Sequence, residues 1–69
     1  MPQYVLTATR GTATITEVIN AVSQHEALRQ CIGPLMRLAF DPKQPERATG
    51  EVTLRDEAGY IVYHDIEEM

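Results

Sequence analysis

The chain has 69 residues, one cysteine and a formal net charge of −4, from ten acidic and six basic side chains. This length allows one domain, residues 1–69, with a thin core that alone supplies roughly 3–5 kcal/mol of stability. The single Cys31 excludes an intrachain disulfide and cannot by itself hold a tetrahedral zinc ion, so oligomerisation or docking is the natural supplement.

Charge and hydropathy also narrow the classes of function. Binding to a phosphate backbone requires clustered Lys and Arg, whereas the six basic residues here are spread along an acidic chain. Direct binding of nucleic acid is therefore not expected. No apolar run approaches the ~18 residues of a membrane span. We expect a cytoplasmic protein without a membrane segment, in which a lone thiol stays reduced.

Two β-like runs open the chain. Apolar and β-branched residues alternate over residues 4–10, and the pattern repeats over residues 12–22 after a short Arg-Gly-Thr connection. Alternation with period two predicts strands, and the short connection predicts an antiparallel hairpin. Glu17 has the same parity as Ile15 and Ile19, so either it points inward near a sheet margin or a bulge redirects it.

A helix is predicted to begin just after Val22. Ser23 can cap it, and Glu26, three residues later, can reach back to the Ser23 backbone N–H as a capping box. Apolar positions at helical spacing continue past Gly33-Pro34. They are Ala27, Leu28, Cys31, Ile32, Leu35, Leu38 and Ala39, with Phe40 closing the end of this stripe. Since proline removes a helix hydrogen bond, the stripe fits either one kinked helix or two short helices, the second beginning at Pro34.

The remainder is predicted to form a loop and a second hairpin. Two prolines and little apolar content predict a surface loop over residues 41–49. Strands are expected over residues 51–55 and 60–64, separated by a turn at 56–59 and followed by an acidic end at 65–69. The order is β-β-α-β-β, an α+β fold with one helix, straight or kinked, on one face of an antiparallel sheet. The covered face should carry Leu6, Ile15, Ile19, Val52 and Leu54.

No catalytic or cofactor-binding constellation is visible in the sequence. His25 and His64 lack the spacing of a metal site, and Cys31 belongs to the apolar stripe, where cysteine behaves as a small hydrophobe. Glu17 has no second acid or base in a fixed relation to it. Arg10-Gly11-Thr12 lacks the glycine spacing and the lysine of a phosphate-binding loop. We expect no catalytic residue, no metal ligand and no cofactor.

The first candidate for binding a partner is an acidic patch, because the last turn and the C-terminal end flank the final strand in sequence. Its candidate residues are Asp56, Glu57, Asp65, Glu67 and Glu68. Acidic residues in such a position usually form a solvated rim. The functional interpretation is a patch that engages a basic partner surface.

The second candidate is the sheet face opposite the helix. Its candidate residues are Val5, Val18, Tyr60 and Tyr63. Exposed β-branched and tyrosine side chains are typical of interfaces. The alternative is a thin sheet with scattered apolar residues, which needs no partner.

The layout resembles a known group of small proteins. A Tyr-Val-Leu-Thr-Ala-Thr strand, a Gly-Thr connection, a second strand, a Ser-x-x-Glu-Ala helix start and a final hairpin are present. This arrangement is similar to that of small phage- and mobile-element-encoded proteins, among them some anti-CRISPR proteins that inhibit type I surveillance complexes. The resemblance implies stoichiometric inhibition, without catalysis or cofactor, by occupying a nucleic-acid-binding or nuclease-docking surface. It extends over most of the chain and transfers no site residue.

We therefore expect a non-enzymatic protein-binding module, in the form of a phage-encoded inhibitor of a host nucleic-acid-binding complex. One alternative is a structural or assembly module that self-associates, for example as a homodimer, through its open sheet face. Another is a small nucleic-acid-binding protein. An enzyme ranks below these, because no nucleophile–base pair or metal cluster is visible.

Overall fold

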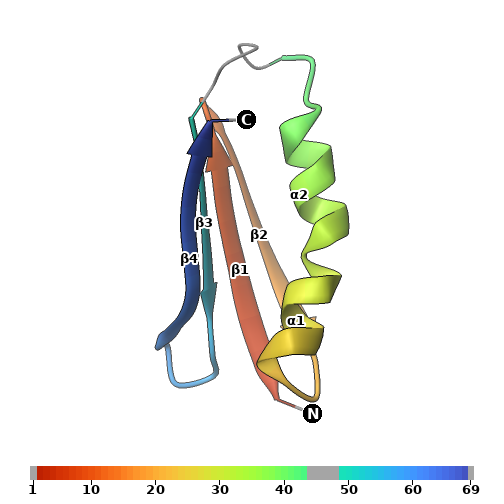
Figure 1. The fold of residues 1–69 in the computed structure, drawn as a ribbon, viewed down its shortest axis with the longest axis vertical. Helices are drawn as coiled ribbons and strands as arrows, with labels where there is room; N and C mark the ends of the chain where they lie inside the picture. Colours follow the sequence, from red (N-terminus) through yellow and green to blue (C-terminus); the bar gives the residue numbers. More distant parts are fainter. Residues whose placement is uncertain (1, 44–48, 69) are drawn as a thin grey trace.

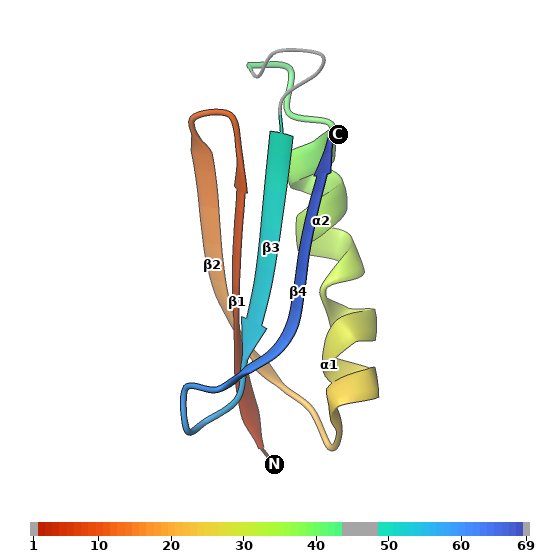
Figure 2. The same cartoon turned by 60° about the vertical axis from the view of Figure 1, so that its left-hand side comes forward.

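A computed structural model describes residues 2–43 and 49–68 and shows a four-stranded antiparallel sheet with a helical layer on one face (Figure 1). The strands are β1 (Gln3–Arg10), β2 (Ala13–Asn20), β3 (Thr49–Arg55) and β4 (Ile61–Glu68). The helices α1 (Gln24–Gln30) and α2 (Ile32–Ala39) lie between β2 and β3 in the chain. The sheet order is β2-β1-β3-β4, so β2 and β4 form its edges (Figure 2). The predicted α+β fold with the order β-β-α-β-β is confirmed.

A glycine with positive φ shapes each hairpin connection. Gly11, with φ of 59°, is the first residue of the β1–β2 turn, the position that type II′ turns reserve for glycine. In the β3–β4 turn, Gly59 has φ of 89° and donates its N–H to the carbonyl of Asp56 over 3.0 Å. The Asp56 carboxylate accepts from the N–H groups of Ala58 and Tyr60 at 3.0 and 2.9 Å. The predicted turn at residues 56–59 is therefore present, and Asp56 organises it.

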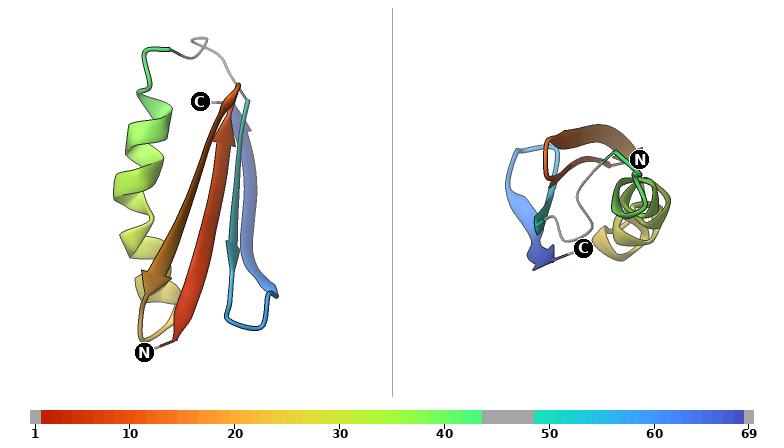
Figure 3. Two further views of the ribbon diagram at one scale, coloured as in Figure 1. Left: turned by 180° about the vertical axis from the view of Figure 1, so that it is seen from behind. Right: turned by 90° about the horizontal axis from the view of Figure 1, so that it is seen from above.

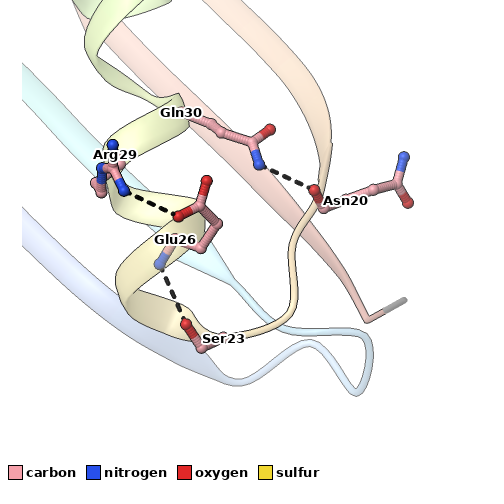
Figure 4. Close-up of polar contacts among 5 residues, drawn as sticks. All are labelled: Asn20, Ser23, Glu26, Arg29 and Gln30. Carbon is pink, nitrogen blue, oxygen red and sulfur yellow. Dashed lines mark hydrogen bonds and ion pairs between the residues drawn. The ribbon is translucent and has the colours of Figure 1, made fainter.

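The helix begins where the sequence predicts. Ser23 is the N-cap, in an extended conformation, and its hydroxyl accepts the backbone N–H of Glu26 over 3.3 Å (Figure 4). The Glu26 carboxylate contacts the Arg29 guanidinium at 3.3 Å, so it does not turn back to Ser23 as a full capping box would require. The Gln30 side chain donates to the Asn20 carbonyl over 3.0 Å and ties the helix to the end of β2.

The kinked form of the helix is the one that occurs, but the bend lies at Cys31 and not at Pro34. Cys31 keeps a right-handed helical conformation, with φ of −72° and ψ of −18°. It is the C-cap residue of α1 and also the N-cap residue of α2. Its N–H is shared between the carbonyls of Ala27 and Leu28, both at 3.2 Å. Pro34 has no N–H for the carbonyl of Gln30, four residues earlier, so the helix loosens in the turn that precedes the proline.

The helical layer covers the predicted face of the sheet. Leu6 and Leu54 are fully buried there, and Ile19 and Val52 are 5% and 8% exposed. Ile15 is half-buried and packs against them. Glu17 lies on this face in edge strand β2, opposite Leu6 in an unbroken β1–β2 register, so the inward alternative is correct and no bulge redirects it.

Three predicted strand boundaries are wrong by two residues or more. The second strand was expected to reach residue 22 but ends at Asn20, since the chain turns there toward the cap at Ser23. The third begins at Thr49, two residues early, and the fourth continues to Glu68 through residues expected to be a tail. Pairing with β3 explains this extension, because Thr49 lies opposite Glu68 and Val52 opposite Asp65, and the ladder outweighs the poor β-propensity of acidic residues. Residues 44–48 of the predicted loop and Met69 of the predicted tail lie outside the described residues.

Two residues assigned to the buried helical stripe are exposed. Ile32 is 61% exposed and Phe40 is 74% exposed, so Ile32 does not face the core and Phe40 does not close it. The buried line runs through Ala27, Cys31 and Leu38 instead. Ile32 follows Cys31 by one residue, a rotation of about 100° around the helix, which moves its side chain from the sheet to the helix flank.

Candidate functional site

One flank of α2 carries three large apolar side chains in a row. Ile32, Met36 and the C-cap residue Phe40 are 61%, 53% and 74% exposed. Positions four apart stack along one side of a helix, so these side chains form a continuous ridge. The ridge shares a groove with Val52 of β3 and Tyr63 of β4, which places it on the flank directed toward that half of the sheet.

Two polar contacts tie the helices to the two edge strands of the sheet. Near the start of α1, the Gln24 amide donates to the carbonyl of Val62 in β4 over 2.9 Å. Toward the end of α2, the Arg37 guanidinium pairs with Glu17 of the opposite edge strand at 2.7 Å. The principal contacts of α2 are with β1 and β2, and Figures 1 and 3 show it nearer to these strands than to β4. The β4 edge of the covered face is therefore left without α2 above it, while Leu54 and Val52 of β3 remain buried.

The space between α2 and the β3–β4 half of the sheet is a groove of about 490 Å³. We name it the α2–β4 groove. Its lining residues are Ile32, Leu35, Met36, Ala39 and Phe40 from the helical side and Val52, Tyr63 and Asp65 from the strands. Its size and mainly apolar lining are typical of binding sites, in which few polar groups fix orientation.

A bulge directs two consecutive β4 side chains toward the helical side. The register shifts between Leu54 and Arg55, so that Leu54 lies opposite Tyr63 and Arg55 opposite Ile61. Val62 is the extra residue, and it packs against the buried core while Tyr63 lines the groove. The bulge explains why the apolar run of β4 does not alternate, and it supplies the aromatic wall of the groove.

Asp65 is the charged side chain among the groove residues. It lies opposite Val52 in the ladder and is half-buried. One carboxylate oxygen accepts the backbone N–H of Ile66 over 3.0 Å. The ion pairs among the side chains that the structure describes are Arg29–Glu26, Arg37–Glu17 and His64–Glu51, and none of them includes Asp65. A carboxylate on an apolar lining favours a ligand group that is cationic or donates hydrogen bonds.

The acidic candidate residues do not come together. Asp56 and Glu57 lie at the β3–β4 turn, and the Glu57 carboxylate accepts the N–H of Gln3 over 2.9 Å. Glu67 and Glu68 lie at the opposite end of β4, beside Gly50 and Thr49, in a molecule about 36 Å long (Figure 1). Among the acidic candidates whose side chains the structure describes, Asp65 is the one that lines the groove. The expectation that residues close in sequence form one patch is wrong because an extended strand separates them.

The sheet-face candidates also lie in three separate places. Val5 and Val18 are directly paired on the face opposite the helices, and Val18 is 61% exposed. Tyr60 is 73% exposed in the β3–β4 turn. Tyr63 lies on the helical side, in the groove. Most other positions on the open face are polar, namely Thr7, Thr9, Thr14, Thr16, Asn20, Thr49, Glu51 and Thr53.

The chemically reactive residues are held in ordinary environments. Cys31 is 2% exposed, and its thiol lies 3.2 Å from the Ala27 carbonyl. Burial, and secondarily the negative charge of Glu17, raise the pKa of this thiol, which keeps it protonated and unreactive. His64 lies 3.6 Å from Glu51 on the open face, and His25 is exposed. Residues 2–43 and 49–68 contain no group of three or more His, Cys, Asp or Glu suited to a metal ion.

Sequence reasoning missed Met36 altogether and misplaced Ile32 and Phe40. A signal for them was present, since apolar residues at 32, 36 and 40 form a second line beside the buried one. A stripe this wide exceeds what one helix needs to cover a sheet of small and medium side chains. The presence of the groove depended on the helix direction, which the sequence pattern does not specify.

In comparisons with known proteins, no family model, characterised protein or solved structure matches the chain. No helix in the described part of the chain is long and apolar enough to span a bilayer.

Proposed function

We propose that this chain is a non-enzymatic protein-binding module that takes an apolar element of its partner into the α2–β4 groove. The observation that carries this proposal is the ridge of Ile32, Met36 and Phe40, each more than half exposed, along a groove of about 490 Å³. Exposed apolar side chains gathered in this way are typical of interaction sites. Leu6 and Leu54 are the largest fully buried side chains, and so thin a core gains stability from docking.

The open sheet face provides less support for binding. Val5 and Val18 are adjacent there, but the surrounding positions are mostly threonine, which water solvates readily. Arg55 stands between Val5 and Ile61 in the cross-strand row, so the apolar residues do not join into one patch. Self-association through this face, the assembly alternative, therefore ranks second.

The finer proposal is that the partner is a host nucleic-acid-binding complex and that docking inhibits it, with the protein acting in the host cytoplasm. It comes from the layout resemblance to anti-CRISPR proteins. The net charge of −4 is compatible with it, because surfaces that hold nucleic acid are basic and attract an acidic protein.

A pair of matched substitutions tests the binding proposal. Met36→Lys and Val18→Lys each replace an exposed apolar side chain, 53% and 61% exposed, by the same cation, the first in the groove and the second on the open face. Wild type and both variants would capture proteins from the native host, and the partner would then be purified and titrated. We expect Met36→Lys to weaken binding at least about tenfold, as loss of an interface anchor does, and Val18→Lys to leave it unchanged. The reverse pattern would move the site to the open face.

The inhibitor proposal needs a separate measurement. With the purified partner in hand, its binding to labelled nucleic acid would be followed as the protein is added. We expect loss of nucleic-acid binding at a one-to-one ratio with wild type and no loss with Met36→Lys. A partner that binds this protein and nucleic acid together, without competition or loss of nuclease recruitment, would contradict inhibition while leaving the binding module intact.

A further inference from the structure

We propose that the occupant of the α2–β4 groove is an amphipathic helix of a partner protein that places a Lys or Arg beside Asp65. This inference rests on the proposed function and specifies the chemistry of the element that docks. Its two parts, the helical shape and the basic charge, come from different observations.

The helical shape follows from the ridge on α2 and the row of β4 side chains that faces it. The inward side chains of β3 are already buried, with Leu54 0% and Val52 8% exposed, so the uncovered floor of the groove is the part of β4 that carries Tyr63. A partner helix can pack against the ridge on one side and against this part of β4 on the other, since packed helices lie about 8–10 Å apart. The ridge from Ile32 to Phe40 spans nine residues, a rise of about 12 Å, which corresponds to about two turns of a partner helix. An extended segment would instead pair with the free edge of β4 and leave the ridge exposed.

The basic charge follows from the electrostatics of the lining. Asp65 is the acidic group within an otherwise apolar lining, and it is half-buried, where a cation interacts more strongly than in open water. The C-terminal end of α2 at Ala39, which also lines the groove, adds partial negative charge from its last carbonyls. A Lys or Arg on the docked helix would lie near both.

The same charges argue against a second copy of this chain as the occupant. Each copy carries a net charge of −4, so two copies repel. A symmetric dimer through the groove would bring two Asp65 carboxylates into one apolar interface. The cation available on α2 is Arg37, which is engaged with Glu17 on the opposite flank of the helix. A basic partner helix avoids both the repulsion between two acidic copies and the approach of two Asp65 carboxylates.

The test uses three synthetic peptides of about 16 residues with the intact protein. The first has leucines at helical spacing flanked by lysines, the second replaces each lysine by glutamate, and the third has the composition of the first in an order that breaks the apolar stripe. NMR titration of the isotope-labelled protein gives affinity and location together. We expect the lysine peptide to bind saturably and to shift the signals of Ile32, Met36 and Tyr63, with the other two at least about fivefold weaker.

A matched pair of variants isolates the role of Asp65. Asp65→Asn and Glu51→Gln each remove one negative charge from neighbouring strands, the first in the groove and the second on the open face. We expect Asp65→Asn to weaken the lysine peptide about fivefold and to abolish its advantage over the glutamate peptide, and Glu51→Gln to do neither.

Each other outcome overturns the inference. Equal binding of the lysine and glutamate peptides, or no effect of Asp65→Asn, would contradict the proposal that the docked helix places a basic residue beside Asp65. If the scrambled peptide binds as tightly as the first peptide, or if no peptide binds, the proposal that the occupant is an amphipathic helix is wrong. Groove signals that shift with protein concentration alone would assign the groove to a second copy. If Met36→Lys still abolishes partner binding in any of these cases, the proposed function stands and this inference alone fails.

Discussion

The two halves of the helix-facing sheet surface have the same strand pattern but different surroundings. On the β1–β2 half, Leu6 and Ile19 lie under the helices and are 0% and 5% exposed. On the β3–β4 half, Leu54 of β3 is still fully buried, but Tyr63 of β4 is 37% exposed, and the ridge on α2 faces it across the groove. The difference teaches that alternation decides which face a side chain takes, while the helix position decides whether that side chain is core or binding surface. Substitutions in the two halves should therefore have different consequences.

The largest effect is expected in the covered half. Leu6→Ala removes a fully buried side chain at the centre of the core and should destabilise the protein by roughly 2–5 kcal/mol. That loss is comparable with the entire stability expected of a domain this small. Chemical denaturation followed by circular dichroism would measure it. A loss below about 1 kcal/mol would mean that the core can collapse around the missing side chain.

A smaller effect is expected at the helix start, which orients the layer over the covered half. Ser23→Ala removes the hydroxyl that accepts the Glu26 N–H and should cost about 0.5–2 kcal/mol. Ser23→Asp is the control, since its carboxylate can still accept this N–H, and it should retain stability. Equal denaturation midpoints for all three proteins would show that the cap contributes nothing.

The ion pair that draws α2 toward β2 should contribute less still. The Arg37 and Glu17 side chains are 72% and 40% exposed, so solvent screens them, and Glu17→Gln should cost about 0.2–1 kcal/mol. Molar salt should reduce the difference between wild type and variant. A difference that is independent of salt would assign the effect of Glu17 to packing instead of charge.

In the groove half, Ile32→Ala should change stability by less than about 0.5 kcal/mol, because Ile32 is 61% exposed and alanine has the higher helix propensity. The same substitution should weaken partner binding. Thermal unfolding at two protein concentrations gives the measurement. A cost above about 2 kcal/mol would show that Ile32 is buried in solution and would remove the distinction between the two halves.

The Cys31 thiol should make stability depend on pH only in alkaline solution, because it is protonated in both the folded and the unfolded chain at neutral pH. Its pKa is raised in the fold above the ordinary value of 9.0, so the folded protein holds the thiol proton more tightly than the unfolded chain does. This contribution is fully present below the ordinary thiol pKa and is lost as pH rises through the folded-state pKa. Wild type should therefore lose more stability than Cys31→Ala above about pH 9. Parallel stability curves for the two proteins at alkaline pH would contradict the raised pKa.

The elements that local chemistry specifies were predicted from the sequence. The alternation in residues 4–10 defined β1, and Gly11 and Gly59 marked the two turns, since only glycine adopts a positive φ without cost. Ser23 fixed the helix start because its hydroxyl satisfies a backbone donor three residues away. Each of these features depends on residues close together in the chain.

The candidate site was predicted only in fragments. Tyr63 and Asp65 were both candidates, but they were assigned to separate surfaces, and Ile32 was assigned to the core. Whether Asp65 belonged to a strand depended on pairing with Val52, thirteen residues earlier in the chain. Local propensity carries no information on such pairing, because the ladder hydrogen bonds come from the partner strand.

By itself, the sequence determined the order of elements, the parity of each strand and the points where the chain turns, since all three follow from backbone conformation and from spacing within a segment. The tertiary structure decided the placement of β3 beside β1, the extension of β4 to Glu68 and the position of α2 over β1 and β2. These depend on contacts between distant segments, such as Gln24 with Val62 and Arg37 with Glu17. The groove exists because one bent helix is too narrow to cover four strands, and its width and direction are properties of the packed molecule.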